Sequence, residues 1–135
     1  MEKIVNVYTD GGARGNPGPA GIGVVAKIKD KIVFKISKFI GHSTNNIAEY
    51  TALDLALDEL SNKYLSAYIK IHLDSELLVK QVNGEYRVKN ESLKKMYERV
   101  TTKMSKFNHV ELIHVKRDKN TLADKLVNYA IDNKK

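Results

Sequence analysis

Cysteine and tryptophan are both absent from this chain of 135 residues. Without thiolates the chain has neither a disulfide framework nor a zinc site built from cysteine, and we expect it in the reducing cytoplasm. Its histidines, at positions 42, 72, 109 and 114, do not stand in the HExxH spacing of a zinc protease. The sequence therefore argues against zinc chemistry.

Long apolar runs are absent as well. No stretch reaches the length of a membrane span, and the N-terminal segment MEKIVNVYTDGG has no long apolar stretch behind its lysine. We therefore expect a soluble protein with neither a secretory signal nor a membrane partner.

Acidic residues are outnumbered by basic ones, since 23 Lys and Arg against 16 Asp and Glu give a formal charge of +7. This balance favours a polyanionic partner such as nucleic acid, because neutralised phosphates release their condensed counterions. The length suits one compact domain over residues 1–135, with one site. No linker, repeat or low-complexity tract divides the chain, and we expect a monomer.

The first part of the chain is predicted to form strands only. Residues 3–9 (KIVNVYT) are apolar and β-branched with a period of two, which is typical of a strand, here ending at Asp10. A glycine-rich turn follows over 11–21. Residues 21–28 and 31–40 flank a polar turn and predict a hairpin. Three strands therefore come before any helix.

The rest of the chain alternates between helices and strands. Helical spacing after a Ser/Thr/Asn cap cluster predicts a helix over 45–64, and alternation predicts a strand over 66–73 that stops at Asp74. The remaining predicted elements are helices over 75–84 and 91–106, a strand over 109–115 and a last helix over 121–131. The order βββαβααβα implies an α/β fold whose five-stranded mixed sheet carries helices on both faces.

The glycine-rich turn has a glycine at every third residue, at Gly12, Gly15, Gly18 and Gly21. These triplets are too few for a collagen helix, and the segment matches neither G-x-G-x-x-G nor a P-loop. Two interpretations stay open. The segment is a flexible turn, or its backbone, free of side chains, closely approaches a bulky polyanion.

Four acidic side chains stand where a site would form, although each also has a structural explanation. Asp10 and Asp74 end strands, at the sheet edge where ligands usually bind, and Asp74 also suits a helix cap. Glu49 lies on the helix face that otherwise packs inward, or else snorkels at the end of the apolar stripe. Asp124 lies in the first turn of the last helix, where an acid also suits the helix dipole.

Four carboxylates brought together would repel one another and force some to protonate, unless divalent cations neutralise them. Oxygen ligands without cysteine favour Mg²⁺ or Mn²⁺, and two such ions would balance the formal charge of the quartet. A pair of these ions about 4 Å apart serves in-line displacement at a phosphodiester. The pattern by itself does not establish that the four acids converge.

Four ordered segments, each carrying one of these acids, resemble the motifs of the ribonuclease H type 1 family. They are YTDGGARGNPGPAG (8–21), STNNIAEYTAL (43–53), HLDSELLVKQVNG (72–84) and HVKRDKNTLADKLVN (114–128). Together they span nearly the whole chain. The resemblance implies a ribonuclease H-like fold and an endonuclease that hydrolyses the RNA strand of RNA/DNA hybrids with two metal ions, leaving 3′-hydroxyl and 5′-phosphate ends.

The resemblance also implies residue roles. The catalytic metal ligands would be Asp10, Glu49, Asp74 and Asp124. Asp10 would bridge the ions, Asp124 would help to hold the ion that activates the nucleophile, and the other two acids would serve the second ion. Short polar groups would line the substrate groove and bond to phosphates, minor-groove edges and the 2′-hydroxyl. These groups belong to Gly11, Asn16, Thr44, Asn45 and Asn46, and helix capping is a compatible local role for the last two.

One departure from longer family members concerns a catalytic histidine. They carry it between the last strand and the last helix, where this chain has residues 116–121 without a histidine. Arg117, Lys119 or the preceding His114 would then assist product departure. Arg117 is the first choice because a permanent cation pairs with phosphate. A solvated basic turn is the alternative.

A second departure concerns the basic, tryptophan-containing protrusion that longer members carry after the third motif, where this chain has only GEYRVKNES. Hybrid binding would then be weaker or differently placed. Part of the missing positive surface would come from Lys89, Lys94, Lys95 and Arg99, unless these charges only solvate a surface helix.

Two other functions are compatible with the sequence. One is a noncatalytic domain that keeps the ribonuclease H-like fold and binds hybrids or duplexes, and the complete acidic quartet argues against it. The other is a nuclease of the same superfamily that acts on double-stranded RNA or DNA. The sequence poorly distinguishes this nuclease from one that acts on RNA/DNA hybrids.

Overall fold

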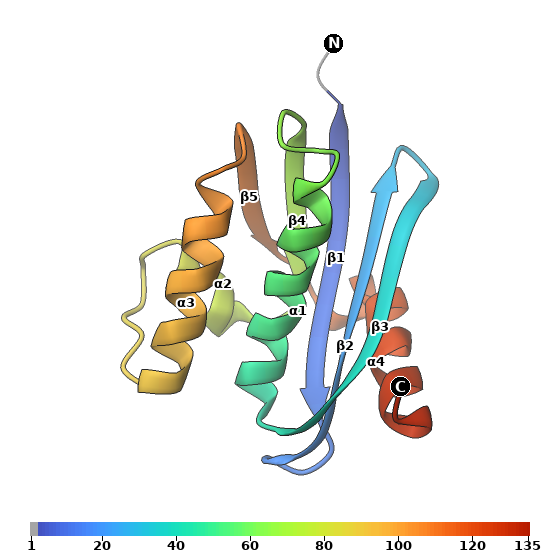
Figure 1. The fold of residues 1–135 in the computed structure, drawn as a ribbon, viewed down its shortest axis with the longest axis vertical. Coiled ribbons are helices and arrows are strands. Elements are labelled where there is room, and N and C mark those ends of the chain that lie inside the picture. Colours follow the sequence, from blue (N-terminus) through green and yellow to red (C-terminus); the bar gives the residue numbers. More distant parts are fainter. Residues whose placement is uncertain (1–2) are drawn as a thin grey trace.

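The structure is a computed structural model that describes residues 3–135; Met1 and Glu2, which begin the stretch expected to lack a secretory signal, lie outside the described residues. Its strands are β1 (Ile4–Ala13), β2 (Gly18–Ile28), β3 (Lys31–Ser43), β4 (Tyr68–Leu73) and β5 (His109–His114). Its α-helices are α1 (Asn45–Ser61), α2 (Glu76–Val82), α3 (Glu91–Met104) and α4 (Thr121–Asn133). The predicted order is confirmed (Figure 1), with a short 3₁₀ turn, η1 (Arg117–Lys119), added before α4.

The strands form one mixed sheet in the order β3-β2-β1-β4-β5. The central strand β1 pairs antiparallel with β2 and parallel with β4. The edge strands are β3, antiparallel to β2, and β5, parallel to β4. Parallel neighbours need crossovers, which are supplied by α1 before β4 and by α2 and α3 before β5.

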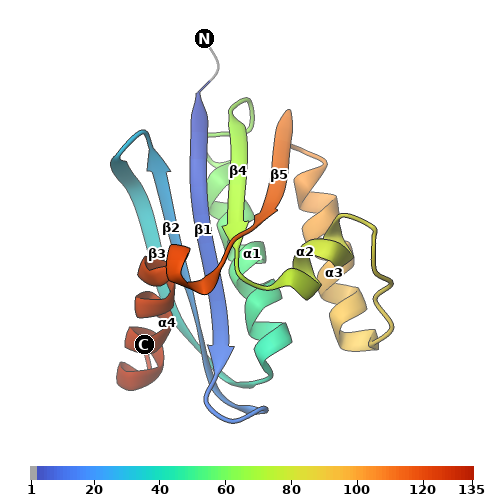
Figure 2. The same cartoon turned by 180° about the vertical axis from the view of Figure 1, so that it is seen from behind.

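Helices cover the two faces of the sheet unequally. Figure 1 shows α1 and α3 on one face with α2 beside them, and Figure 2, from behind, shows α4 on the other face over β2 and β3. The expected five-stranded mixed sheet with helices on both faces is confirmed. No helix within residues 3–135 combines the length and the apolar character that crossing a membrane requires.

The glycine-rich segment is mostly strand, which corrects the prediction. β1 continues to Ala13 and β2 begins at Gly18, so only residues 14–17 form the turn and Asp10 lies inside β1. Packing against helices explains two of these glycines, because a Cβ added to Gly11 would collide with α1 and one added to Gly21 would lie 3.1 Å from atoms of α4. A Cβ added to Gly18 would instead collide with the carbonyl oxygen of Arg14 within the turn. Just beyond the segment, a Cβ added to Gly23 would lie 2.2 Å from the carbonyl oxygen of Ala123 in α4.

Elsewhere the predicted elements exist and their ends shift by a few residues. β3 continues to Ser43, α1 ends at Ser61, and α4 continues to Asn133. The core lies between α1 and the sheet. Alternate residues of β1 and β4 point to the sheet face that packs against α1. Its large buried side chains include Val5, Val7, Leu53, Leu57, Leu60, Ile69 and Ile71.

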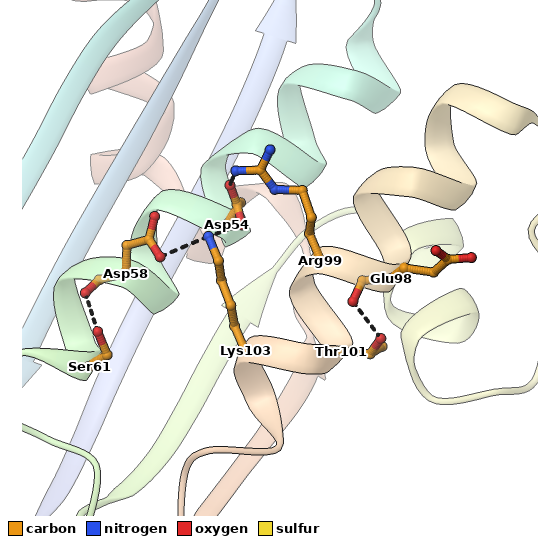
Figure 3. Close-up of polar contacts among 7 residues, drawn as sticks. All are labelled: Asp54, Asp58, Ser61, Glu98, Arg99, Thr101 and Lys103. Atoms are coloured by element: carbon orange, nitrogen blue, oxygen red, sulfur yellow. Dashed lines mark hydrogen bonds and ion pairs between the residues drawn. The ribbon is translucent and has the colours of Figure 1, made fainter.

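An acid that the sequence did not single out, Asp54, is buried between α1 and α3, with 4 % of its surface exposed. Its carboxylate accepts hydrogen bonds from Arg99 Nη2 at 3.0 Å and from Lys103 Nζ at 2.6 Å (Figure 3). A buried charge needs compensation, which the two cations of α3 supply. The ion pairs therefore hold α3 against α1. Arg99, expected to add to a positive binding surface, is therefore engaged in an ion pair.

Candidate functional site

Two of the predicted acids flank the point where the central strands part. β1 and β4 pair in parallel only as far as Tyr8 and His72. Beyond this point β4 ends and Asp74 follows, whereas β1 continues through Asp10, which is opposite Gly23 of β2. The end of β4 therefore leaves a gap in the strand pairing, and beside this gap the carboxylates of Asp10 and Asp74 lie within 4.8 Å of each other.

The other two acids reach this gap from helices on opposite faces of the sheet. α1, which carries Glu49, begins after Thr44, whose Oγ1 accepts the N–H of Ile47. α4, which carries Asp124 in its first turn, is fixed at its start by Asn120. The side-chain Nδ2 of Asn120 donates to the carbonyl oxygen of Thr9 at 2.9 Å, immediately before Asp10.

The four acids form one neighbourhood with two parts. Carboxylate oxygens of Asp10, Glu49 and Asp74 all lie within 4.8 Å of one another. Asp124 lies outside that close set but lines an adjoining pocket of about 250 Å³ together with Asp10 and Glu49. The convergence that the sequence pattern left open is therefore present in the fold.

Burial among other carboxylates raises the pKa of Asp10 from 3.8 to about 8. Burial is the largest cause, followed by the negative charges of Asp74, Glu49 and Asp124 and by a hydrogen bond with Asp124. Without a cation, Asp10 therefore holds its proton near neutral pH.

The pKa of Glu49 is raised from 4.5 to about 7, mainly by burial. A side-chain hydrogen bond from Ser75 lowers this pKa, and the negative charge of Asp74 raises it. The positive charge of Arg117 also lowers it. The pKa of Glu49 thus depends on the neighbouring carboxylate of Asp74 and on the guanidinium of Arg117.

The donor set fits a divalent cation that prefers oxygen ligands. Asp74 Oδ2 is buried without a hydrogen-bond partner among residues 3–135, although a buried carboxylate oxygen normally has one. Together with the raised pKa values of Asp10 and Glu49, this indicates a cluster that is electrostatically incomplete without positive charge. Carboxylates without cysteine or histidine suit Mg²⁺ or Mn²⁺.

The three residues expected to assist product departure in place of a catalytic histidine lie in different places, and Lys119 lines a separate pocket with Tyr8 and Lys27. Arg117, in η1, lines the same pocket as Asp10, Glu49 and Asp124. His114 does not line it, and its Nδ1 lies 4.0 Å from the carboxylate of Glu76. The structure therefore brings Arg117, and not His114, to the acids.

The predicted groove residues surround the start of α1. Asn45 accepts the N–H of Ala13 at 2.8 Å through Oδ1, and its own N–H donates to Asn16 Oδ1 at 3.1 Å. A neighbouring pocket is lined by Asn16, Thr44 and Asn46, whereas Gly11 is buried. Capping belongs to Thr44 rather than to the two asparagines, which corrects the local role expected for them.

Several residues of the site were missed by the sequence reasoning. Ser75 caps α2 and also bonds to Glu49, so its place directly after Asp74 is the signal that was available. Asn128, one helical turn after Asp124, donates to that carboxylate at 3.4 Å. The guanidinium of Arg14 bonds to Asn128 and pairs with Asp132, which joins the β1–β2 turn to α4.

Comparison with known proteins gives consistent matches over almost the whole chain. A family model described as reverse transcriptase-like matches residues 8–130. A bifunctional protein of Mycobacterium tuberculosis is 39 % identical over 132 residues, which cover 96 % of this chain and 36 % of that protein. Ribonuclease HI of Halobacterium salinarum is 37 % identical over 129 residues, which cover 95 % of this chain and 64 % of that enzyme. The chain thus spans about a third of the mycobacterial protein.

Among solved structures, LC11-RNase H1, isolated from compost by a metagenomic approach, superposes with a TM-score of 0.92. It is 43 % identical, and the match covers 98 % of both chains. The same enzyme has been solved in complex with an RNA/DNA hybrid, and that structure superposes with a TM-score of 0.91 at 42 % identity, over 96 % of this chain and 97 % of that chain.

Proposed function

The chain belongs to the ribonuclease H type 1 family, and from this membership we propose that it is an endonuclease that hydrolyses the RNA strand of RNA/DNA hybrids. The observation that carries the proposal is the meeting of Asp10, Glu49 and Asp74 within 4.8 Å, next to a pocket that Asp124 lines. The hybrid as substrate is supported by the solved complex of the similar LC11 enzyme.

The residues that would hold two divalent ions are the same four acids. Asp10 would contribute to holding both ions, Asp124 would help to hold one of them, and Glu49 with Asp74 would help to hold the other. When bound, Mg²⁺ or Mn²⁺ ions neutralise the carboxylates and the phosphate and favour attack by water. In the proposed reaction water attacks phosphorus as the bond to O3′ breaks. The leaving oxygen gains a proton, which gives 3′-hydroxyl and 5′-phosphate ends.

The other polar residues bind and orient the strand. Arg117 lies beside Glu49 in the pocket and pairs with a phosphate, because a guanidinium stays charged at every working pH. Asn16, Thr44 and Asn46 line the next pocket along the start of α1, where short polar groups suit phosphates and 2′-hydroxyls. Gly11 is buried and would shape the groove through the position of its backbone. Asn45 would shape it through its hydrogen bonds with Ala13 and Asn16.

We further propose that residues 1–135 act as one monomeric domain in a reducing cytoplasm. The site residues lie on one sheet and on the elements that pack against it, and the chain has no cysteine. Light scattering after gel filtration should give the mass of a single chain, and a stable dimer would contradict the monomer.

The function is tested by incubating the protein and an Asp10→Asn variant with labelled RNA/DNA hybrid, double-stranded RNA and double-stranded DNA. Each substrate is tried with Mg²⁺, Mn²⁺ or EDTA. We expect cutting of the hybrid RNA strand with metal only, and loss of cutting in the variant. Product ends are read by extension with a polymerase that needs a 3′-hydroxyl and by digestion with an exonuclease that needs a 5′-phosphate.

The rival functions give different results in the same experiment. Binding of hybrid without cutting under either metal would identify a noncatalytic domain. Faster cutting of double-stranded RNA than of hybrid would identify the other nuclease activity. Metal-dependent cutting that persists in Asp10→Asn would place the chemistry elsewhere or in a contaminant.

A further inference from the structure

In the part of the chain that the structure describes, no helix covers part of the sheet face that carries α4. Figure 2 shows β1, β4 and β5 uncovered above the segment that connects β5 to α4. Side chains alternate along these strands, so the neighbours of the core residues Val7 and Ile71 point to this face. We call it the bare face and define it by Asn6, Tyr8, Lys27, Tyr68, Lys70, His72 and His109.

Aromatic rings are paired across the strands of the bare face. Tyr8 stacks on His72 with ring centroids 4.5 Å apart and planes 14° apart. Tyr68 lies against His109 at 3.7 Å with planes 35° apart. All four side chains are at least partly exposed, although the sheet offers a buried face on its other side. Exposed rings in a row are the feature that sequence-tolerant nucleic-acid surfaces use to stack bases.

Lysines accompany these rings. The ammonium of Lys27 lies 5.9 Å from the Tyr8 ring centroid, and that of Lys70 lies 5.5 Å from the Tyr68 centroid. Glu111 is the acid at this edge, and it accepts the Tyr68 hydroxyl at 2.9 Å and lies 3.6 Å from His109. Its charge is therefore engaged locally, while the lysines contact rings and stay available to phosphates.

The bare face continues into a pocket of about 210 Å³ at the start of α4. Tyr8 and Lys27 form one wall, and Lys119, Asn120 and Thr121 form the other. Two lysines thus face a small cavity beside an aromatic ring. Ammonium groups with an aromatic neighbour suit a nucleotide, whose phosphate is anionic and whose base has a π-face.

The bare face and the acid cluster are neighbours. Tyr8 precedes Asp10 by two residues on β1, and Lys119 follows Arg117 by two residues in η1. Arg117 lines the acidic pocket while Lys119 lines the lysine pocket, so η1 separates the two cavities. A strand that leaves the acids past η1 therefore meets the bare face.

We propose that the bare face, together with the Lys27 and Lys119 pocket, binds a single-stranded segment of nucleic acid that continues from the strand held at the acid cluster. The inference rests on the proposed function, which brings a strand to those acids. A single strand is the occupant because its bases are free to stack on side chains, whereas the bases of a duplex stack on one another. The enzyme would then prefer hybrids with unpaired tails.

The test measures binding by fluorescence anisotropy in EDTA, which prevents cutting. The probes are a blunt RNA/DNA hybrid, the same hybrid with a single-stranded RNA tail, and the same hybrid with its tail made double-stranded. For the wild-type protein, we expect the single-stranded tail to increase affinity about tenfold and the double-stranded tail to add little.

Three variants separate charge from stacking. The double variant Lys27→Ala/Lys119→Ala should lose most of the gain from the tail, and its logarithmic salt slope should become shallower by about 1.4, or about 0.7 for each lost phosphate contact. Lys27→Arg/Lys119→Arg keeps the charges and should keep the gain. Tyr68→Leu should reduce the gain at an unchanged salt slope, because it removes a ring and no charge.

Lys63→Ala is the matched control, because Lys63 is exposed in the turn between α1 and β4, away from the bare face. Equal affinity of the wild-type protein for tailed and blunt hybrids would overturn the inference, as would a gain that survives loss of both lysines. Cutting of the blunt hybrid is measured in parallel. If the blunt hybrid is cut and the tail adds nothing, only this inference fails, whereas absence of any cutting counts against the proposed function.

Discussion

Gly11 of β1 lies in backbone contact with Ala48 of α1: a Cβ added to Gly11 would stand 2.3 Å from the carbonyl carbon and oxygen of Ala48. It would also stand 2.6 Å from the backbone nitrogen of Glu49. Because Asp10 precedes Gly11 and Glu49 follows Ala48, this contact sets how closely the two carboxylates approach. The close approach of strand and helix is thus part of the acidic site.

The first prediction follows from this contact. Gly11→Ala should push α1 away from β1, destabilise the protein by about 2 kcal/mol and weaken Mn²⁺ binding at least about tenfold. Denaturant unfolding and titration calorimetry with Mn²⁺ measure the two effects. Gly12→Ala is the matched control, since its Cβ would meet nothing closer than 3.8 Å. Equal Mn²⁺ affinities of the two variants would contradict the positioning role.

The second prediction concerns pH in the absence of metal. Folding raises the pKa of Asp10 to about 8 and that of Glu49 to about 7, so the folded chain binds these protons more tightly than the unfolded chain. Their contribution to stability is therefore full below about pH 4 and is lost as the pH rises to about 8. Asp10→Asn removes one of the crowded charges and should raise metal-free stability at pH 8 by about 1 to 3 kcal/mol.

Unfolding in urea, in EDTA and across this pH range, checks the prediction. The difference between variant and wild type should shrink as the pH falls below about 4, because below the ordinary pKa of 3.8 Asp10 becomes protonated in the unfolded state as well as in the folded state. Saturating Mg²⁺ should stabilise the wild-type protein more than the variant, since the ion replaces the repulsion with attraction. A difference that is constant with pH would contradict the carboxylate crowding.

The third prediction concerns the ion pairs between α1 and α3. Arg99→Ala/Lys103→Ala leaves the carboxylate of Asp54 buried without a cation and should cost about 3 kcal/mol of unfolding free energy. Asp58, which also pairs with Lys103 but is more than half exposed, supplies the control (Figure 3). Asp58→Ala should change stability by no more than about 0.5 kcal/mol. Equal losses of unfolding free energy in the double variant and in Asp58→Ala would contradict the idea that the burial of Asp54 makes its ion pairs important for stability.

The fourth prediction separates Arg117 from His114, two of the three candidates for assisting product departure. Arg117→Ala should lower the rate of hybrid cutting about tenfold and shift the pH at which Mn²⁺ is half bound upward, because Arg117 lowers the pKa of Glu49. His114→Ala should change neither by more than about twofold, since His114 lies against Glu76. The pH profile of Mn²⁺ binding reports the electrostatic effect independently of cutting. An effect of His114→Ala as large as that of Arg117→Ala would refute the assignment.

Local patterns predicted the elements well because their causes are local. The alternation in 66–73 and the helical spacing after Thr44 come from residues that are close along the chain. The extent of β1 was missed because it ends in Gly11, Gly12 and Ala13, and two adjacent glycines look like a turn in sequence. Only the tertiary contact of Gly11 with α1 shows that close helix packing requires a glycine there.

The sequence by itself determined the order of the elements, the four acids and their family resemblance, because strand and helix periodicity and motif order are properties of the chain. Whether those acids meet was decided by tertiary structure. The early end of β4, the approach of α1 at Gly11 and the anchoring of α4 by Asn120 bring together residues as far apart as 10 and 124. The burial of Asp54, the separation of Arg117 from His114 and the bare face likewise depend on which surfaces pack, and packing is a long-range property.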